Sequence, residues 1–158
     1  AGGGGVGSMG DARLWALMVP VGVTVGSGVM MIQDISVFVE SAGTAVAPAD
    51  LVVTISLGNL GGRWAGGFLS DFSHARLGVP RVVALAVSAA LICAAAATLA
   101  GTDSRDARTF HLAGALVGVA VGAAFGVWPT AVRESFGGPR YAANLAIVMG
   151  ACGVGSVA

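Results

Sequence analysis

Residues 110–132 read FHLAGALVGVAVGAAFGVWPTAV, and their single ionisable side chain, His111, stands near the start. The hydrocarbon core of a bilayer is about 30 Å thick, and a helix of roughly 20 apolar residues spans it. A backbone in lipid must satisfy its own hydrogen bonds, which a helix does. The stretch therefore predicts a transmembrane helix, with Pro129 near its end.

Four further apolar runs have comparable lengths. The first has no charge from Leu14 to Ile32 and continues to Phe38 through Gln33 and Asp34. Elements of a soluble α/β protein are shorter and alternate with charged faces. We therefore expect an all-α membrane protein with five transmembrane helices, at 14–38, 51–69, 82–100, 110–132 and 141–158, preceded by a Gly-rich segment at 1–11.

The composition excludes several classes of protein. Charged residues make up 10% of the chain, against about 25% in soluble domains. The chain has scattered Arg and no Lys, which argues against a nucleic-acid partner. Cys93 and Cys152 lie in separate apolar runs and predict neither a disulfide nor a metal site. Residues 5–10 match GxGxxG, but no strand precedes them. No catalytic arrangement is present, so we expect neither an enzyme nor a cofactor.

The arginines predict the orientation, because cytoplasmic loops are rich in Arg and Lys. Five arginines fall on one side of the expected membrane and two on the other. The first group is Arg13, Arg76, Arg81, Arg133 and Arg140, and the second is Arg105 and Arg108. We therefore expect the amino end in the cytoplasm and the 101–108 loop outside. Both ends of the chain look cut, which predicts a piece of a longer protein.

Glycines recur at every fourth position in two of the runs. These positions are Gly58, Gly62 and Gly66 in the second run, and Gly114, Gly118, Gly122 and Gly126 in the fourth. Residues four apart share a helix face, and small residues let helices in lipid approach closely. Two interpretations stay open and are compatible: tight packing in any helical bundle, and a sliding surface for alternating access.

Arg63 is the residue that points most directly to function, because it lies about two-thirds of the way through the second run. A charge at that depth is costly and is a functional candidate by default. One interpretation is a structural ion pair with Asp34; the other is a ligand for an anion or carboxylate, which suits the planar guanidinium fork. Asn59, one turn earlier, could add a neutral donor and acceptor.

Other charged residues stand near the ends of the runs. Asp34 is either a hydrated carboxylate at the membrane interface or a group that couples transport to a proton or cation. The remaining set forms either a solvated cluster or a gate whose ion pairs exist in one conformation only. It comprises Asp71, Arg76, Arg81, Arg133 and Glu134.

Three segments, in order, resemble the nodulin-like branch of the major facilitator superfamily. They are GNLGGRWAGGFLSDF at 58–72, FGVWPTAVRESFG at 125–137 and YAANLAIVMG at 141–150. The first contains Gly67-Phe68-Leu69-Ser70-Asp71, similar to the G-x-L-x-D loop motif of that superfamily. Arg76 and Arg81 stand for its basic part, although the usual G-R/K is replaced by 77–81, LGVPR.

The resemblance implies helices seven to eleven of a twelve-helix transporter, without its first half and last helix. The spacing from Asn59 to Arg63 is also similar to an Asp-x-x-x-Arg pair of monocarboxylate porters. In those porters the Arg is implicated in binding the substrate carboxylate and the Asp in proton coupling. Because this chain has Asn instead of Asp at position 59, the Arg role carries over better than the coupling role.

We therefore expect a multi-pass secondary transporter of a small solute, with an organic anion or monocarboxylate as the candidate. Its partners would be the lipid bilayer, the solute and the rest of the same chain. Transport by alternating access requires Asn59, Arg63 and Asn144 to converge on a polar groove. The alternative is a non-transporting membrane protein, either a solute sensor or a packing module, in which these residues would be scattered or paired off.

Overall fold

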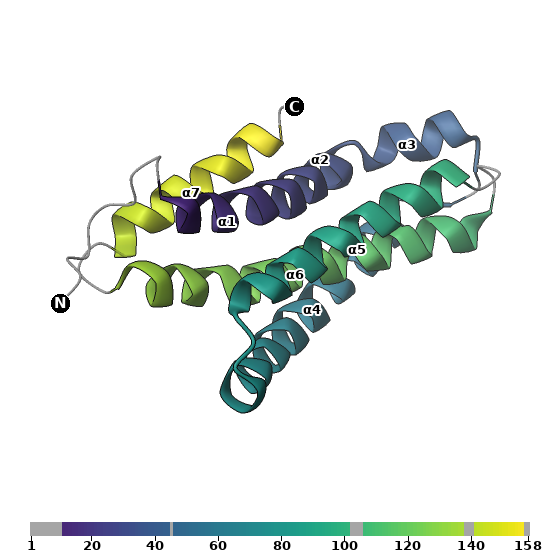
Figure 1. Ribbon diagram of the computed structural model, residues 1–158. Helices are drawn as coiled ribbons and strands as arrows, with labels where there is room; N and C mark the ends of the chain where they lie inside the picture. The colour runs from purple at the N-terminus through teal and green to yellow at the C-terminus, as the bar shows by residue number, and fades with distance from the viewer. Residues whose placement is uncertain (1–10, 45, 102–105, 138–140, 157–158) are drawn as a thin grey trace.

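The computed structural model describes residues 11–44, 46–101, 106–137 and 141–156, and all the regular elements in these ranges are helices (Figure 1). In chain order they are α1 (Ala12–Val21), the π-helical turn η1 (Gly22–Gly26), α2 (Ser27–Gln33), α3 (Ile35–Ala42), α4 (Pro48–Leu77), α5 (Arg81–Gly101), α6 (Ala107–Phe136) and α7 (Tyr141–Gly155). The predicted all-α class is confirmed for this part of the chain. The Gly-rich segment except Asp11, loop residues 102–105 and Arg140 lie outside it.

Three helical stretches are long and apolar enough to cross a membrane, and they indicate a membrane protein. They are Ala12–Gln33, Arg81–Gly101 and Ala107–Phe136. α4 has 30 residues, but Asn59, Arg63 and its glycines make it less apolar than these three. α7 has 15 residues, which span about 22 Å at ~1.5 Å each, less than a bilayer core. The count of five spans therefore stays a prediction.

The first apolar run is not one uninterrupted α-helix. Its start is fixed by Asp11, whose carboxylate accepts a hydrogen bond from the backbone N–H of Arg13 at 2.9 Å. Hydrogen bonds from the Arg13 side chain and backbone hold the pKa of the Asp11 carboxyl below its usual value. Pro20 lacks a backbone donor, and η1 begins two residues after it. At Asp34 the backbone leaves helical geometry, with φ −93° and ψ 10°, and α3 begins.

A tight turn joins α4 to α5. Gly78 ends α4 with φ +65°, a conformation that glycine adopts without the cost of a Cβ. Its N–H donates to the carbonyl of His74 at 3.2 Å, and the N–H of Val79 donates to that of Ser73 at 3.4 Å. Pro80 then precedes α5. The turn reverses the chain, so that Ser70 and Asp71 of α4 lie beside Arg81, the first residue of α5.

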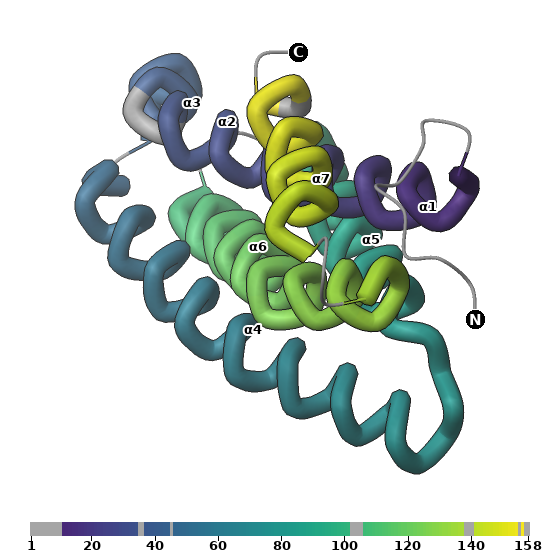
Figure 2. Tube along the Cα trace, turned by 90° about the vertical axis from the view of Figure 1, so that its left-hand side faces the viewer, coloured from purple at the N-terminus to yellow at the C-terminus, as the bar shows by residue number. Residues whose placement is uncertain are grey.

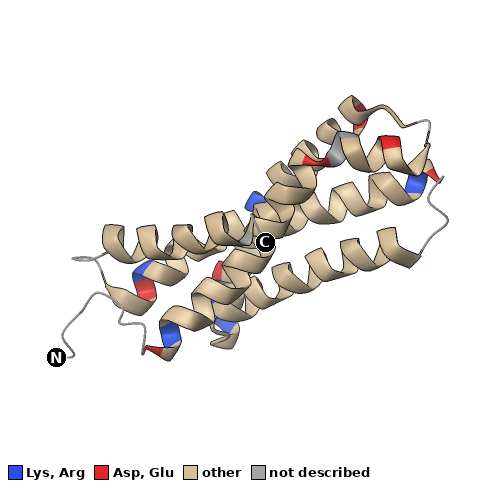
Figure 3. Ribbon diagram, turned by 90° about the horizontal axis from the view of Figure 1, so that it is seen from above, with Lys and Arg blue, Asp and Glu red and all other residues tan. Residues whose placement is uncertain are grey.

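α6 is the central helix of the bundle. It packs against α4 and α5, and also against α1, η1, α2 and α7. Figure 2 shows α4 on one side of α6, with α1, α2, α3 and α7 on the other. The largest apolar cluster joins α1, η1, α5, α6 and α7 through Leu14, Leu17, Val21, Val25, Leu85, Ala124, Val127, Trp128, Ala131, Val132, Phe136 and Val148. In Figure 3 charged residues gather mainly toward the ends of the helices.

The two glycine series meet in the interface between α4 and α6. A Cβ added to Gly58 would lie 2.9 Å from the carbonyl oxygen of Ala115, and one added to Gly66 would lie 2.6 Å from the Cα of Ala123. Such separations are shorter than carbon and oxygen atoms tolerate, so the two backbones are in direct contact.

The remaining glycines of the two series divide into two groups. A Cβ on Gly62, Gly118, Gly122 or Gly126 would overlap the backbone of Val119, Ile55, Asn59 or Arg63, respectively. Gly114 differs, because its nearest neighbour would be the Ile55 side chain at 3.4 Å, an ordinary contact. The backbones of Asn59 and Arg63 therefore rest directly on α6.

Candidate functional site

Arg63 is held by two contacts that leave part of its guanidinium available. Its Nε donates a hydrogen bond to Oδ1 of Asn59, one turn earlier on α4, at 2.9 Å. Its Cζ lies 5.0 Å from the ring centroid of Phe125 on α6, within the range of a cation–π interaction. Its two terminal nitrogens make no hydrogen bond within the described residues. The end of the fork is thus free to bind a planar anion.

No acidic side chain neutralises Arg63 in the part of the chain that the structure describes. The ion pairs found there join Arg13 to Asp11, and Arg81 to Asp71 and Glu134. The expected alternative of an ion pair with Asp34 therefore does not form. Asp34 is half-buried at the break between α2 and α3, and it makes no ion pair among the described residues.

Arg63 and Asn59 border a cavity of about 380 Å³ on one side of α4. Its lining consists of Ile32, Val52, Ile55, Ser56, Asn59, Leu60 and Arg63. Small-molecule sites are typically cavities of roughly 300–1,000 Å³, mostly apolar, with a few convergent polar groups. This cavity has a comparable volume but is open on one side, because six of its seven lining residues lie on α4, and the exposed guanidinium is its charged group.

Asn144 does not line this cavity, so the described residues do not show the expected convergence of three residues, which stays a prediction. It is fully buried on α7, which packs against α1, η1 and α6, whereas α4 packs mainly against α6. α6 therefore stands between the two helices (Figure 2). The sequence could not show this, because helix order along the chain does not fix which helices are neighbours in a bundle.

Arg81 connects the ends of three helices in what we call the Arg81 cluster: Ser70, Asp71, Arg81 and Glu134. Nε of Arg81 donates to both carboxylate oxygens of Glu134 on α6, at 2.9 and 2.8 Å. One terminal nitrogen binds Asp71 of α4 and donates to Oγ of Ser70 at 3.3 Å. The side chain of Arg81 is 11% exposed, against 68% for Asp71 and 42% for Glu134. The cluster thus ties α4, α5 and α6 together at one end.

The other residues of the expected gate stay outside this cluster. The side chains of Arg76 and Arg133 form neither an ion pair nor a hydrogen bond within the described ranges. Arg133 instead lines a separate cavity of about 370 Å³ with Pro129, Thr130 and Tyr141. Gly67 is not tightly packed against α6, because an added Cβ would lie 3.8 Å from the carbonyl oxygen of Gly126, an ordinary van der Waals distance.

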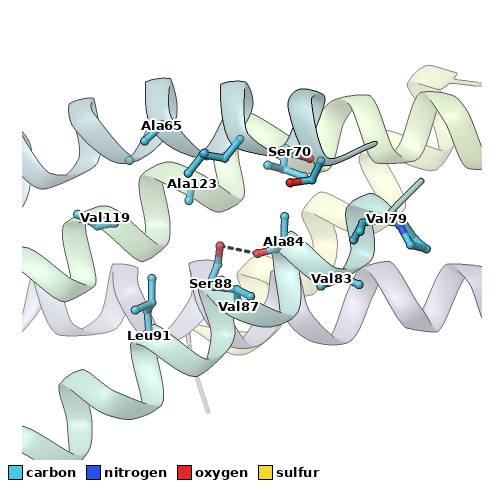
Figure 4. Close-up of a pocket in the computed structure, with 16 residues that line it drawn as sticks. Ala65, Ser70, Val79, Val83, Ala84, Val87, Ser88, Leu91, Val119 and Ala123 are labelled. Carbon is cyan, nitrogen blue, oxygen red and sulfur yellow. Dashed lines mark hydrogen bonds between the residues drawn. The ribbon is translucent and has the colours of Figure 1, made fainter. Parts of the chain in front are cut away.

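An apolar groove of about 300 Å³ lies between α4, α5 and α6 (Figure 4). Its walls are mainly Val, Leu, Ala and Gly side chains. Two of its hydroxyls already have partners: Ser88 donates to the carbonyl of Ala84 at 3.0 Å, and Ser70 accepts from Arg81. The groove therefore offers little to a polar solute, in contrast to the cavity beside Arg63.

Several contacts were missed by sequence reasoning. Phe125 and Ser70 lie in two of the three segments that resemble the superfamily. No sequence pattern predicts that Phe125 contacts Arg63 or that Ser70 binds Arg81. Oγ1 of Thr54 on α4 lies 2.9 Å from Nδ1 of His111 on α6, a further hydrogen bond between these helices. Within the described residues, no group of three or more His, Cys, Asp or Glu side chains could hold a metal.

The chain matches no family model, no curated protein and no solved structure. The resemblance to the major facilitator superfamily therefore stays a prediction carried by the three sequence segments.

Proposed function

We propose that this chain is part of a multi-pass membrane transporter that binds a small organic anion at Arg63 and moves it by alternating access. The observation that carries the proposal is the arrangement of Arg63. Its guanidinium is positioned by Asn59 and Phe125, has no acidic partner among the described residues and borders a cavity. Such a group is suited to bind a carboxylate through two parallel hydrogen bonds.

The cost of placing Arg63 within a membrane supports a functional role. Insertion scales assign roughly 2.5–3.5 kcal/mol to an Arg at the centre of a transmembrane helix. A structural Arg would offset this cost with an acidic partner, which is absent here within the described residues. A hydrated cavity that admits an anion is an alternative way to offset it.

The Arg81 cluster and the glycine interface support the conformational part of the proposal. Alternating access requires contacts that can form in one state and open in another. The Arg81 cluster joins three helix ends through ion pairs whose carboxylates are partly exposed. In the proposed transporter it acts as the cytoplasmic gate, and α4 and α6 move together as one rigid pair.

We further propose that the five helices correspond to helices seven to eleven of a major-facilitator-type bundle. The remainder of that bundle would cover the side of α4 that carries the Arg63 cavity. The alternative is a non-transporting packing module or solute sensor. The close contact of α4 and α6 favours a packing role equally well, because it needs no solute. Solute uptake distinguishes the two.

The test is uptake of labelled acetate, lactate and benzoate into liposomes that contain the complete protein in which this sequence occurs. We expect Arg63→Ala to abolish uptake nearly completely. Arg63→Lys keeps the charge but not the planar fork. A hydrogen bond to a charged group contributes about 1.5–3 kcal/mol, so this variant should lose on the order of tenfold in affinity.

Arg108→Ala is the matched control, because Arg108 is an exposed arginine in the first turn of α6. Its removal should leave uptake unchanged. Normal uptake by Arg63→Ala, with all variants folded, would overturn the proposal in favour of a packing role.

A further inference from the structure

The described side chains that contact the guanidinium of Arg63 cannot change their charge. Its hydrogen-bond partner is the amide of Asn59, and its ring contact is Phe125. An amide and a phenyl ring do not titrate, and an Arg side chain stays protonated in proteins. The cavity beside Arg63 therefore carries one permanent positive charge from the residues that line it.

Titratable groups of the described residues on α4 and on the elements packed against it lie outside the cavity lining. They and the other charged groups there are Asp34, Glu40, Asp50, Asp71, His74, Arg76, Arg81, Cys93, Arg108, His111, Arg133 and Glu134. Asp71 and Glu134 bind Arg81. His111 binds Thr54, nine residues before Arg63 on α4, which is about 13 Å along a helix. Asp34 forms no ion pair with Arg63.

We infer that the Arg63 site takes a monovalent anion without a proton, so that each transport cycle moves one net negative charge. The inference rests on the proposed function, because it describes the same cavity. A cycle that stays electroneutral by proton coupling would need an acid or base that gains a proton with the anion, and no residue that lines the cavity is one. Position 59, where such a group would meet Nε of Arg63, is occupied by an amide.

Binding at different pH values gives the first test. The probes are methanesulfonate, which stays ionised, and benzoate, titrated calorimetrically into the purified complete protein between about pH 6 and pH 8. We expect the affinity for each ionised probe to stay constant within about twofold. Asp34→Asn and His111→Gln should leave this profile flat. Affinity that rises severalfold as the pH falls would overturn the inference but not the proposed function.

A variant at position 59 separates charge from hydrogen bonding. Asn59→Asp places a carboxylate beside Nε of Arg63 and neutralises the site, so the affinity for methanesulfonate should fall at least tenfold. Asn59→Ala removes the hydrogen bond without adding charge and should lower the affinity only a few-fold. Equal affinity in the Asp variant and in the unmodified protein would overturn the inference. Failure of the unmodified protein to bind either probe would overturn the proposed function as well.

Accumulation against a membrane potential gives the second test. One charge that crosses a potential of 100 mV changes an equilibrium ratio by up to about fiftyfold. An inside-positive potassium diffusion potential should therefore drive accumulation of labelled methanesulfonate in proteoliposomes at equal pH on both sides. Accumulation that follows an imposed pH gradient and ignores the potential would overturn the inference. Loss of all accumulation in Arg63→Ala shows that the flux passes through this site.

Discussion

Arg81 illustrates how a single side chain can decide which helix ends lie together. It is largely buried, while the two carboxylates that it binds remain partly in contact with solvent. Exposed ion pairs contribute only about 0–1 kcal/mol each. Arg81, however, binds two acids and a hydroxyl from two other helices at once, and its burial limits screening by solvent. We therefore expect the Arg81 cluster to stabilise the structure more than an isolated surface pair.

The corresponding prediction compares two arginines that are five residues apart. Arg81→Ala removes every contact of the Arg81 cluster and should destabilise the complete protein by about 1–2 kcal/mol. Arg76→Ala removes a side chain without partners among the described residues, and its effect should stay within about 0.5 kcal/mol. The midpoints of thermal unfolding in detergent measure both effects. Equal midpoints for the two variants would show that the cluster contributes nothing to stability.

Contacts within one helix could be predicted from the sequence, and contacts between helices could not. The spacing of four residues places Asn59 beside Arg63 on any helix, and the structure shows their hydrogen bond. Phe125 is 62 positions away from Arg63, and only the register of α4 on α6 brings the two together. For the same reason, the sequence alone could not show whether Arg63 forms an ion pair with Asp34.

Helices α4 and α6 form the closest-packed pair of elements. Hydrophobic burial does not drive helices together in lipid, because the lipid chains are equally apolar. The attraction between such helices comes instead from dispersion contacts between closely spaced backbones. Each contact is weak, but there are many of them. Glycine at the contact positions is what permits this approach, so the pattern of glycines determines the register of the pair.

Two adjacent glycines on α4 test this interpretation. A Cβ at Gly62 would overlap the carbonyl of Val119, whereas nothing lies within 4 Å of a Cβ at Gly61. Replacing an unconstrained helical glycine with alanine gains up to about 1 kcal/mol. Gly61→Ala should therefore raise the melting temperature in detergent, and Gly62→Ala should lower it. A rise for both variants would show that α4 and α6 are not in backbone contact in the membrane protein.

At the level of helices, apolar run length was a good guide to where helices occur and a poorer guide to their interruptions. The run at 82–100 corresponds to α5 within one residue at each end. The run at 14–38 is interrupted at η1 and again at Asp34. Pro20 and Asp34 are visible in the sequence, but packing decides whether such residues bend a helix, break it or are accommodated.

In the whole molecule, α6 packs against most of the other helices and the charged residues lie mainly at the ends of the bundle (Figure 3). Arg76 and the Arg81 cluster occur where α4 ends and α5 begins. Arg108 occurs beyond the far end of α5, in the first turn of α6. α5 has 21 residues, which span about 31 Å and so match the thickness of a bilayer core.

This geometry and the distribution of arginines together predict the topology. Arg76→Cys should react with a membrane-impermeant maleimide only from the cytoplasmic side of sealed vesicles, and Arg108→Cys only from the outside. Cys93 and Cys152 are first replaced by Ser, so that each variant has one thiol within this sequence. Labelling of both positions from the same side would show that α5 does not cross the membrane. Labelling with the two sides exchanged would keep α5 as a span but reverse the orientation. The Arg81 cluster would then lie on the outer face and could not act as the cytoplasmic gate.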